Sequence, residues 1–472
     1  MPHRLLLAAA SSLALAACAT GPDYAARPAP PTAAGPFLSA GDPALVSAAP
    51  ADEHWWRLYE DPVLDRLVAD ALGANTDIRV AVARLARARA SLREVRGDRE
   101  PRVGVGAGGQ YGRPGGAGTP VGGDDFQLSA GLEVAFEVDL FGRVSRNVEA
   151  ARGDLAASAA DADSVRVAIA AGTALAYAEA ASAAERIGVA ERIVALLDRS
   201  LELTRRRHSV GLANGLDTAR IAALRDQRRA EIPALAAQRQ AALFRLATLT
   251  GRTPAELPPE AGARRATLRL DRAIPVGDGA ALLARRPDIR AAERRLASAT
   301  ARIGVATADL YPRITLGGSV GAAGTGLGSL LSNPVGWLVG PLLNWTANRN
   351  AARARIAGAE ADSQAALASF DGTVLTALEE TETALSNYAR SLERRAALRD
   401  ARDQAEAAAR ITRARQREGQ IDSLELLDSE RTAADAQASL AAAEASIANA
   451  QVDLFRALGG GWQSAPIAAA QP

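Results

Sequence analysis

The chain has 472 residues, enough for two or three ordinary domains, and its 55 basic and 54 acidic side chains leave a formal net charge of +1. A charge so balanced gives no electrostatic footprint for nucleic acid. Every basic residue is arginine, which excludes a P-loop lysine and Schiff-base chemistry. Three histidines and one cysteine argue against a His/Cys metal cluster.

The first residues, MPHRLLLAAASSLALAACATGPDY, predict export and a lipid anchor. Arg4 and the apolar run after it are typical of a signal peptide, residues 1–17, which is too short to span a bilayer. Its end, Leu-Ala-Ala-Cys, resembles a bacterial lipoprotein box, so Cys18 would become the first mature residue and carry diacylglycerol and an N-acyl chain. An ordinary signal peptide with an incidental cysteine is the alternative, but Cys18 has no second cysteine to pair with. Ala19 leaves the sorting of such a lipoprotein open, and residues 18–51, rich in Pro and Ala, predict an extended, lipid-anchored linker.

An internal duplication is the most informative feature of the sequence. Residues 76–106 recur at 287–317 with a constant offset of 211, and later matches follow at offsets of 203 and then 208. The last change predicts five residues inserted into a helix of the second repeat. The resulting division is repeat 1 over 52–251, a connector over 252–280, repeat 2 over 281–462 and a C-terminal tail over 463–472.

Each repeat has the same order of predicted elements: a helix, two β segments and two very long helices. At a rise of 1.5 Å per residue, a helix of sixty-odd residues is about 100 Å long, which suits a tube or a solvated coiled coil better than a compact core. No run of eighteen apolar residues predicts a transmembrane helix. The predicted helices are 62–98, 143–209 and 214–250, then 281–310, 347–417 and 421–458; the predicted strands are 101–113 and 126–140, then 312–323 and 335–345.

Residues 126–140 alternate strictly between apolar and polar side chains, which predicts a strand with one apolar face. No charge lies on that face, while Glu133, Glu137 and Asp139 lie on the other, as expected where one face meets lipid. A soluble sheet packed on helices would alternate as well. Four strands cannot close a barrel by themselves, so a membrane barrel needs a dimer with eight strands or a trimer with twelve. The predicted lipid-facing residues include Phe126, Leu128, Leu132, Val134, Phe136 and Val138.

No motif in the sequence indicates an enzyme. Gly104, Gly106 and Gly109 match the spacing of a dinucleotide-binding loop, but no predicted helix follows them. His54 and His208 are isolated from other ligand-type residues. Nucleophile-elbow and His-Glu-x-x-His motifs are both missing from the sequence.

The whole mature chain resembles the outer-membrane factor lipoproteins of the TolC/OprM/NodT efflux type. The resemblance lies in LAACATGPDY, HWWRLYEDPVLDRLVADALGANTDIRVA, RRPDIRAAERRL and EGQIDSLELLDSERT. It implies a mainly α fold with membrane β: a homotrimer whose twelve-stranded barrel in the outer membrane of a Gram-negative bacterium continues into a long α-helical barrel in the periplasm. The implied function is a passive exit duct of a tripartite pump, working without a cofactor and joined through a periplasmic membrane-fusion adaptor to an inner-membrane transporter, the RND type being favoured.

Two segments, 207–220 and 417–430, are where each long helix must reverse. Gly211 and Gly419 are placed to end the outgoing helices, and Asn214 and Asp422 to begin the returning ones. In the family these reversals are the periplasmic tips. The apolar tip residues Val210, Leu212 and Ile421 are expected to dock the adaptor, or alternatively to close the tip upon itself.

The same resemblance places Glu425 and Asp428 at the periplasmic aperture, where six carboxylates of a trimer would form a ring that attracts cations. Asp217 and Arg220 are the equivalent residues of repeat 1. Arg220 is expected to pair with an acid of the second tip and to hold the aperture closed; the alternative is solvated surface charge. Trp55 and Trp56 are expected to anchor the N-terminal segment on the helices, in the same equatorial belt as the connector.

Two other protein classes remain open on the sequence alone. A coiled-coil periplasmic lipoprotein would explain the anchor and the helices but leaves the charge-free strand face unexplained. A porin-like uptake channel would explain the strands but not the very long helices. The exported compound cannot be identified from the sequence.

Overall fold

The computed structural model describes residues 20–26, 31–41, 45–112, 125–346, 348–421 and 423–460. Cys18, Asp422, the signal peptide and the C-terminal tail therefore lie outside the described residues. The chain divides into two compact units, whose boundaries fall inside helices α3, α4, α7 and α9. Unit 1 comprises Met1–Arg27, Arg84–Ala159 and Ala291–Gly372; unit 2 comprises Pro28–Ala83, Ala160–Arg290 and Thr373–Pro472.

The order of the elements confirms the duplication. Repeat 1 consists of α2 (Pro62–Ala74), α3 (Thr76–Gly97), β2 (Arg102–Gly112), β3 (Asp125–Val138), α4 (Arg143–Ser209) and α5 (Gly215–Leu249). Repeat 2 consists of α6 (Gly279–Arg285), α7 (Pro287–Ala308), β5 (Arg313–Thr325), α8 (Gly326–Ser332), β6 (Gly336–Asn344), α9 (Asn350–Arg417) and α10 (Ser423–Ala457). The segments before and between the repeats hold η1 (Pro31–Ala33), β1 (Val46–Ser47), η2 (Trp55–Tyr59), η3 (Pro254–Glu256), η4 (Pro259–Gly262) and β4 (Ile274–Pro275).

The first helix predicted for each repeat is in fact two helices, broken at Asn75 and at Arg286. Each breaking residue holds the end of its own repeat's last helix: the Asn75 amide donates to the carbonyl of Leu249 at 2.9 Å, and the Arg286 guanidinium donates to that of Ala457 at 2.8 Å. The break therefore satisfies carbonyls that a helix end leaves unpaired. Two residues were sequence signals for these breaks: Asn75, a favoured residue at a helix start, and Pro287, in the first position of α7.

The long helices match their predicted positions, but the predicted five-residue insertion is wrong. α4 has 67 residues and α9 has 68, so the two helices differ by one residue. Buried Thr173 and Thr381, which lie 208 apart, each donate to the carbonyl four residues earlier. The offset of 208 thus already holds in the middle of these helices, and the matches at 203 arose from repeated Thr-Ala-Leu and Arg-Asn composition.

Although the sequence has no run of eighteen apolar residues, one described helix, α4, is long and apolar enough on average to span a membrane. By length and composition it qualifies, although 78% of its most apolar window is buried within the chain. Burial of that kind is what a core helix shows, and the apolar residues are accounted for by packing against the rest of the chain.

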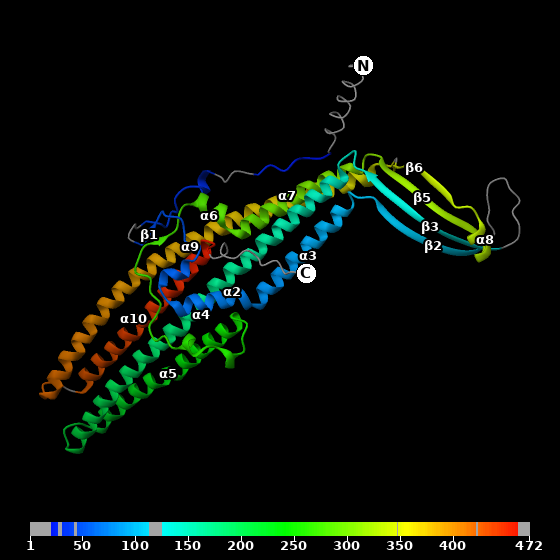
Figure 1. The fold of residues 1–472 in the computed structure, drawn as a ribbon. Helices are drawn as coiled ribbons and strands as arrows, with labels where there is room; N and C mark the ends of the chain where they lie inside the picture. The colour runs from blue at the N-terminus through cyan, green and yellow to red at the C-terminus, as the bar shows by residue number, and fades with distance from the viewer. Residues whose placement is uncertain are drawn as a thin grey trace. The chain divides into compact units, whose positions relative to one another are not determined.

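Four antiparallel strands form one sheet in the order β2-β3-β5-β6 (Figure 1). Each hairpin is consecutive in sequence, and β3 and β5 join the two repeats at the centre of the sheet. The segment between β5 and β6 was expected to be a turn, but it contains the short helix α8. The Asn333 side chain just after α8 donates to the carbonyl of Ala323 at 2.8 Å and ties the helix end to β5.

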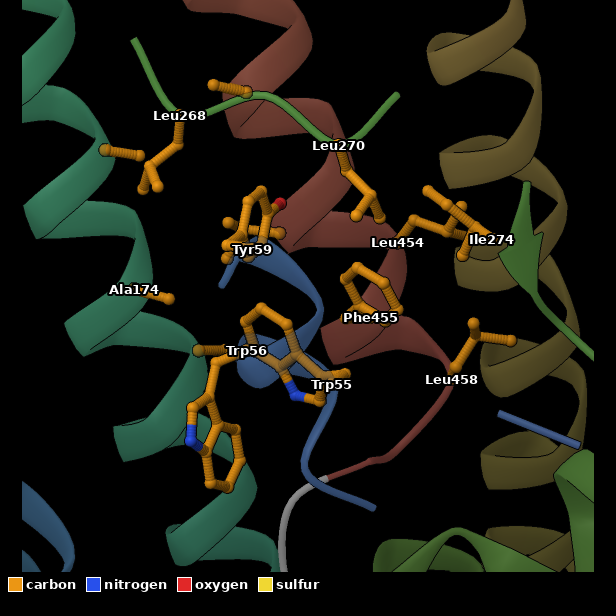
Figure 2. Close-up of a cluster of buried hydrophobic side chains, with 14 of the residues drawn as sticks. Trp55, Trp56, Tyr59, Ala174, Leu268, Leu270, Ile274, Leu454, Phe455 and Leu458 are labelled. Carbon is orange, nitrogen blue, oxygen red and sulfur yellow. The ribbon is translucent and has the colours of Figure 1, made fainter. Parts of the chain in front are cut away.

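The core of unit 2 is built around the N-terminal segment (Figure 2). Trp55 is completely buried and stacks on Phe455 of α10, with ring centroids 4.7 Å apart and planes at 10°. Trp56 is buried beside it, as predicted for the Trp-Trp pair. The connector takes part through Leu268, Leu270 and Ile274, and β4 pairs with β1 in parallel.

Candidate functional site

The strand register sorts the sheet into two chemically distinct faces. Directly opposed residues share a face, so the alternating residues of β3 align with one face of each neighbouring strand. We call the face that holds Leu132 the apolar face and the other the polar face. The apolar face is formed by Val103, Val105, Ala107, Gly109 and Tyr111; Phe126, Leu128, Ala130, Leu132, Val134, Phe136 and Val138; Ile314, Leu316, Gly318, Val320, Ala322 and Gly324; and Trp337, Val339, Pro341 and Leu343. The polar face includes Gln127, Ser129, Glu133, Glu137, Thr315 and Ser319.

No described helix covers the apolar face. Val105 is 86% exposed, Trp337 78% and Leu132 38%, and Phe136 is not buried either. Among the described elements, α8 is the helix that packs on the sheet, against β5 and β3. The expectation of a soluble sheet covered by helices therefore fails for the described chain. A continuous exposed apolar surface of this kind marks a membrane or protein contact.

Aromatic side chains gather where β3, β5 and β6 meet the helices. Phe141 stacks on Tyr311 with centroids 4.6 Å apart, and the indole of Trp345 donates to the carbonyl of Leu310 at 3.2 Å. Arg349 lies 5.4 Å from the centre of the Trp345 ring. Such amphipathic rings beside an apolar band are typical of the membrane–water boundary of a barrel.

The first described residues are fixed at this same junction. Thr20 donates through its amide and its hydroxyl to the carbonyl of Phe141, at 3.2 and 2.9 Å. Arg146 donates to the carbonyl of Thr20 and to the Asp23 carboxylate, at 3.2 and 2.5 Å. Gly21 has φ +89°, and a Cβ there would overlap the backbone of Gly304.

Replacing Gly21 with alanine should release this N-terminal segment. The side chain would meet both the left-handed backbone and the Gly304 overlap, at a cost of about 1–3 kcal/mol. Chymotrypsin should then cut after Tyr24 at least several times faster than in the wild type. Gly35→Ala is the matched control, because a Cβ at Gly35 meets nothing within 4 Å; equal cutting rates in the two variants would contradict the prediction.

Both helix reversals have the predicted glycine ends. Gly211 has φ +77° and Gly419 has φ +75°. The Gly211 amide donates to the carbonyl of His208, and that of Leu212 to the carbonyl of Arg207, which is the Schellman pattern. Asn214 begins α5 in a capping box with Asp217, at 2.9 and 3.4 Å.

Apolar side chains at the reversals face solvent in the single chain. Val210 is 68% exposed and Leu212 is 69% exposed, so these two do not close the first tip upon itself; Ile421 is half-buried. Leu216 and Leu424, in the first turns of the returning helices, are also exposed and were missed. Their spacing of 208, the offset between the two tips, was the signal that could have found them.

The acids at the tips are placed differently from one another. Asp217 is engaged in the capping box, Glu425 lies 3.8 Å from Arg415, and Asp428 is exposed. Arg220 is exposed and forms no ion pair with any described residue of the chain. The structure thus does not bring Arg220 to the second tip within one chain.

A different arginine joins the two tips. Arg207, in the last turns of α4, donates to the carbonyl of Gln416 near the end of α9 at 2.8 Å. Sequence reasoning missed this contact, although a basic residue near a helix end is suited to bind unpaired carbonyls. A second link lies further along the hairpins, where Arg228 of α5 contacts Asp435 of α10.

Hairpin α9–α10 also contains a buried ion pair. Glu430 is 2% exposed and accepts two hydrogen bonds from Arg413, at 2.5 and 3.0 Å. The hydrogen bond from Arg413 to this carboxylate raises the pKa of the arginine above its ordinary value. Removal of Arg413 alone would leave the buried Glu430 carboxylate without its partner, whereas the partly exposed Arg413 can reach water.

Among the described residues, no group of three His, Cys, Asp or Glu side chains could hold a metal ion. Gly104, Gly106 and Gly109 lie within β2, which pairs along its whole length with β3. These glycines therefore lie in a strand and do not form a dinucleotide-binding loop, as the lack of a predicted helix after them indicated.

Comparison with known proteins gives consistent similarities over nearly the whole chain. Outer membrane protein OprJ of Pseudomonas aeruginosa is 32% identical over 462 residues, covering 96% of this chain and 94% of the relative. The solved outer-membrane channel OprN is 38% identical, with a TM-score of 0.88 over 94% of this chain and 100% of that one. The outer membrane protein VceC of Vibrio cholerae is 26% identical, with a TM-score of 0.78 over 88% of this chain and 100% of that one.

The model of the family described as outer membrane efflux protein matches residues 67–252 and 280–460, one range in each repeat. Together with two duplicated halves, one open-edged sheet and two long helical hairpins, this match shows that the chain belongs to the outer membrane efflux protein family, with a TolC-like fold.

Proposed function

We propose that three copies of this chain form the outer-membrane channel of a tripartite efflux pump. The observation that carries the proposal is an exposed, charge-free apolar face on a sheet whose two edges, β2 and β6, are both open. In lipid, each unpaired backbone group at such an edge costs several kcal/mol. Four strands from each of three copies give a closed barrel of twelve, a size within the known range.

The barrel assigns an environment to each face. Phe126, Leu128, Leu132, Val134, Phe136 and Val138 face lipid, and the polar face with Glu133 and Glu137 lines the aqueous duct. The α-helical hairpins continue the duct into the periplasm. Transport is passive and needs no cofactor, because the inner-membrane transporter supplies the energy.

The tips are the surface for a periplasmic membrane-fusion adaptor. Val210, Leu212 and Ile421 dock apolar residues of the adaptor hairpins beside the reversals at Gly211 and Gly419. The relatives include the "Toluene efflux pump outer membrane protein TtgF" of Pseudomonas putida, 31% identical over 98% of this chain. By analogy the cargo is small and apolar or amphipathic, and the transporter is of the RND type.

Cys18 is the lipid anchor in this proposal. The hydrogen bonds of Thr20 to Phe141 hold the start of the mature chain beside the aromatic junction, where an acyl chain can enter the bilayer directly. Two or three acyl chains anchor firmly, whereas one binds reversibly.

The function is tested on the full mature chain in three steps. Particle mass in detergent should correspond to a trimer, planar bilayers should show ion conductance, and pull-down from cells should recover an adaptor. A monomer without conductance would indicate a coiled-coil lipoprotein and contradict the proposal. A conducting trimer that never recovers an adaptor would favour uptake over export.

Two arginines at the tips should differ in their effect on the resting channel. We expect Arg207→Ala to raise conductance, because it frees the carbonyl of Gln416 and separates the two hairpins. Arg220→Ala and Asp428→Ala should raise it only if Arg220 pairs with an acid of a neighbouring copy. Single-channel recordings of the three variants show which of these contacts restrains the resting channel. Wild-type conductance in Arg207→Ala would contradict the role of Arg207 in joining the two hairpins.

A further inference from the structure

β6 departs from the two-faced pattern of the sheet. Leu338 and Leu342 lie on the polar face, opposite Ser319 and Thr315. They are 69% and 63% exposed, respectively. The same face of β2, β3 and β5 has no large aliphatic side chain. Two exposed leucines at a free edge, on a face otherwise suited to water, need a partner outside the chain.

The other free edge of the sheet, β2, has glycines on its polar face, whereas β6 has large leucines there. On the polar face of β2, a Cβ added to Gly104 or Gly106 would meet nothing within 4 Å, and one on Gly108 only the Ser129 hydroxyl at 3.5 Å. The central glycines differ, since a Cβ on Gly131 would lie 3.0 Å from the carbonyl oxygen of Val320. Glycine weakens a strand and often marks the close approach of another group. Among the described residues of one chain, nothing approaches the positions of a Cβ on Gly104 or Gly106.

We propose that β6 of one copy pairs with β2 of the next so that Leu342 lies over Gly104 or Gly106 of the neighbour, on the duct side, with Leu338 over the adjoining part of the same strand. This inference rests on the trimeric barrel proposed above and adds the side chains that close its seam. Strand directions alternate along β2-β3-β5-β6, so β6 meets the neighbour's β2 antiparallel. The apolar faces of the two copies are then continuous, because odd-numbered residues of both strands face lipid.

Pro341 gives a reason why this seam needs side-chain packing. Proline has no amide hydrogen, and in sheets it occupies edge strands with its nitrogen toward the free edge. The seam therefore lacks one hydrogen-bond donor of β6. With the backbone of Pro341 turned outward, Leu338 and Leu342 fall in non-hydrogen-bonded pairs, where facing Cα atoms are only about 4.5 Å apart. A glycine opposite leaves room for the leucine to lie flat.

The chain already contains one such contact. The Cδ1 atom of Leu342 lies 3.1 Å from the position of a Cβ on Gly317 of β5. One flank of this leucine thus rests on a glycine inside the chain, and the neighbour's β2 offers the equivalent surface to the other flank.

Strand lengths restrict the register of the seam. β6 has nine residues and β2 has eleven, so complete pairing of β6 allows three shifts. Only two of them keep the apolar faces together. The first places Leu342 opposite Gly104 and Leu338 opposite Gly108; the second places Leu342 opposite Gly106 and Leu338 opposite Gln110. The third pairs Leu342 with Val105, so the polar face of β6 would meet the apolar face of the neighbour's β2.

Disulfide trapping tests this arrangement directly in the full-length protein. The only native cysteine, Cys18, is blocked by lipidation, so thiols are introduced as Leu342→Cys combined with Gly104→Cys or with Gly106→Cys. Facing Cα atoms in an antiparallel pair lie within disulfide range. Mild oxidation of outer membranes should give covalent dimers and trimers on non-reducing gels with at least one pair.

Leu343→Cys with the same two glycine variants is the matched control, since Leu343 lies one residue away on the apolar face. Cross-linking by Leu343→Cys as strong as by Leu342→Cys would overturn the inference. So would a trimeric particle in which neither Leu342→Cys pair cross-links. A monomeric particle would instead contradict the barrel itself.

Valine substitution in β2 gives a second test, because the single chain and the proposed seam predict opposite effects on the stability of the trimer. Valine at position 104 or 106 has open space in the chain and favours strand structure. The seam predicts the opposite for the glycine that faces Leu342: of Gly104→Val and Gly106→Val, the variant at that position should lose most of its SDS-resistant trimer. Ala107→Val adds the same kind of bulk on the lipid side and should keep it. SDS-resistant trimers equal to wild type in both valine variants would overturn the proposal.

Discussion

Leu132→Arg should abolish insertion of the channel into the outer membrane, whereas Glu133→Arg should be tolerated. Leu132 lies in the middle of β3 on the apolar face, opposite Val320. An arginine facing lipid near the bilayer midplane costs about 2–4 kcal/mol, and a trimer would bear that cost three times. Glu133 lies on the polar face, where arginine stays in water.

The measurement is the amount of heat-modifiable trimer in outer-membrane fractions, with drug susceptibility of the cells as a second readout. Leu132→Ala controls for lost side-chain volume and should insert normally. Equal loss of trimer in the Leu132→Arg and Glu133→Arg variants would show that β3 does not separate lipid from water, and the barrel interpretation would fail.

Trp55→Ala should produce the largest loss of folding stability among single substitutions in unit 2. The side chain is fully buried and stacked on Phe455, within the cluster that joins the N-terminal segment, the connector and the helices (Figure 2). Truncating a buried tryptophan to alanine costs about 3–5 kcal/mol. We expect a clear drop in the thermal unfolding midpoint followed by circular dichroism, together with early proteolysis of the N-terminal segment.

Trp55→Phe separates stacking from hydrogen bonding. The indole nitrogen of Trp55 has no hydrogen-bond partner among the described residues, so phenylalanine should keep most of the stability. Trp345→Ala, at a half-exposed site, should change the midpoint little. A midpoint as low in Trp345→Ala as in Trp55→Ala would mean that the cluster does not limit unfolding.

Local patterns in the sequence predicted the elements whose cause is local. Strict alternation located β3, proline fixed the ends of α3 and α7, and the glycines at 211 and 419 marked both reversals. The duplication added the order of elements, because two copies of one pattern confirm each other.

Expectations failed where distant residues decide the outcome. Asn75 and Arg286 break their helices to bind carbonyls at Leu249 and Ala457, about 170 residues later in each case. Arg207, rather than Arg220, contacts the second tip because the two hairpins lie beside each other. The leucines at 338 and 342 are anomalous only once the register shows which face they occupy.

By itself the sequence determined the duplication, the two-faced strands and the lengths of the helices, since all three follow from repeating patterns along the chain. Tertiary structure alone decided which strands become edges, which helix ends are held by remote side chains, and where space is left for a neighbour. Those outcomes depend on hydrogen bonds between backbone groups and partners more than a hundred residues away. Local periodicity in the sequence does not predict such pairs.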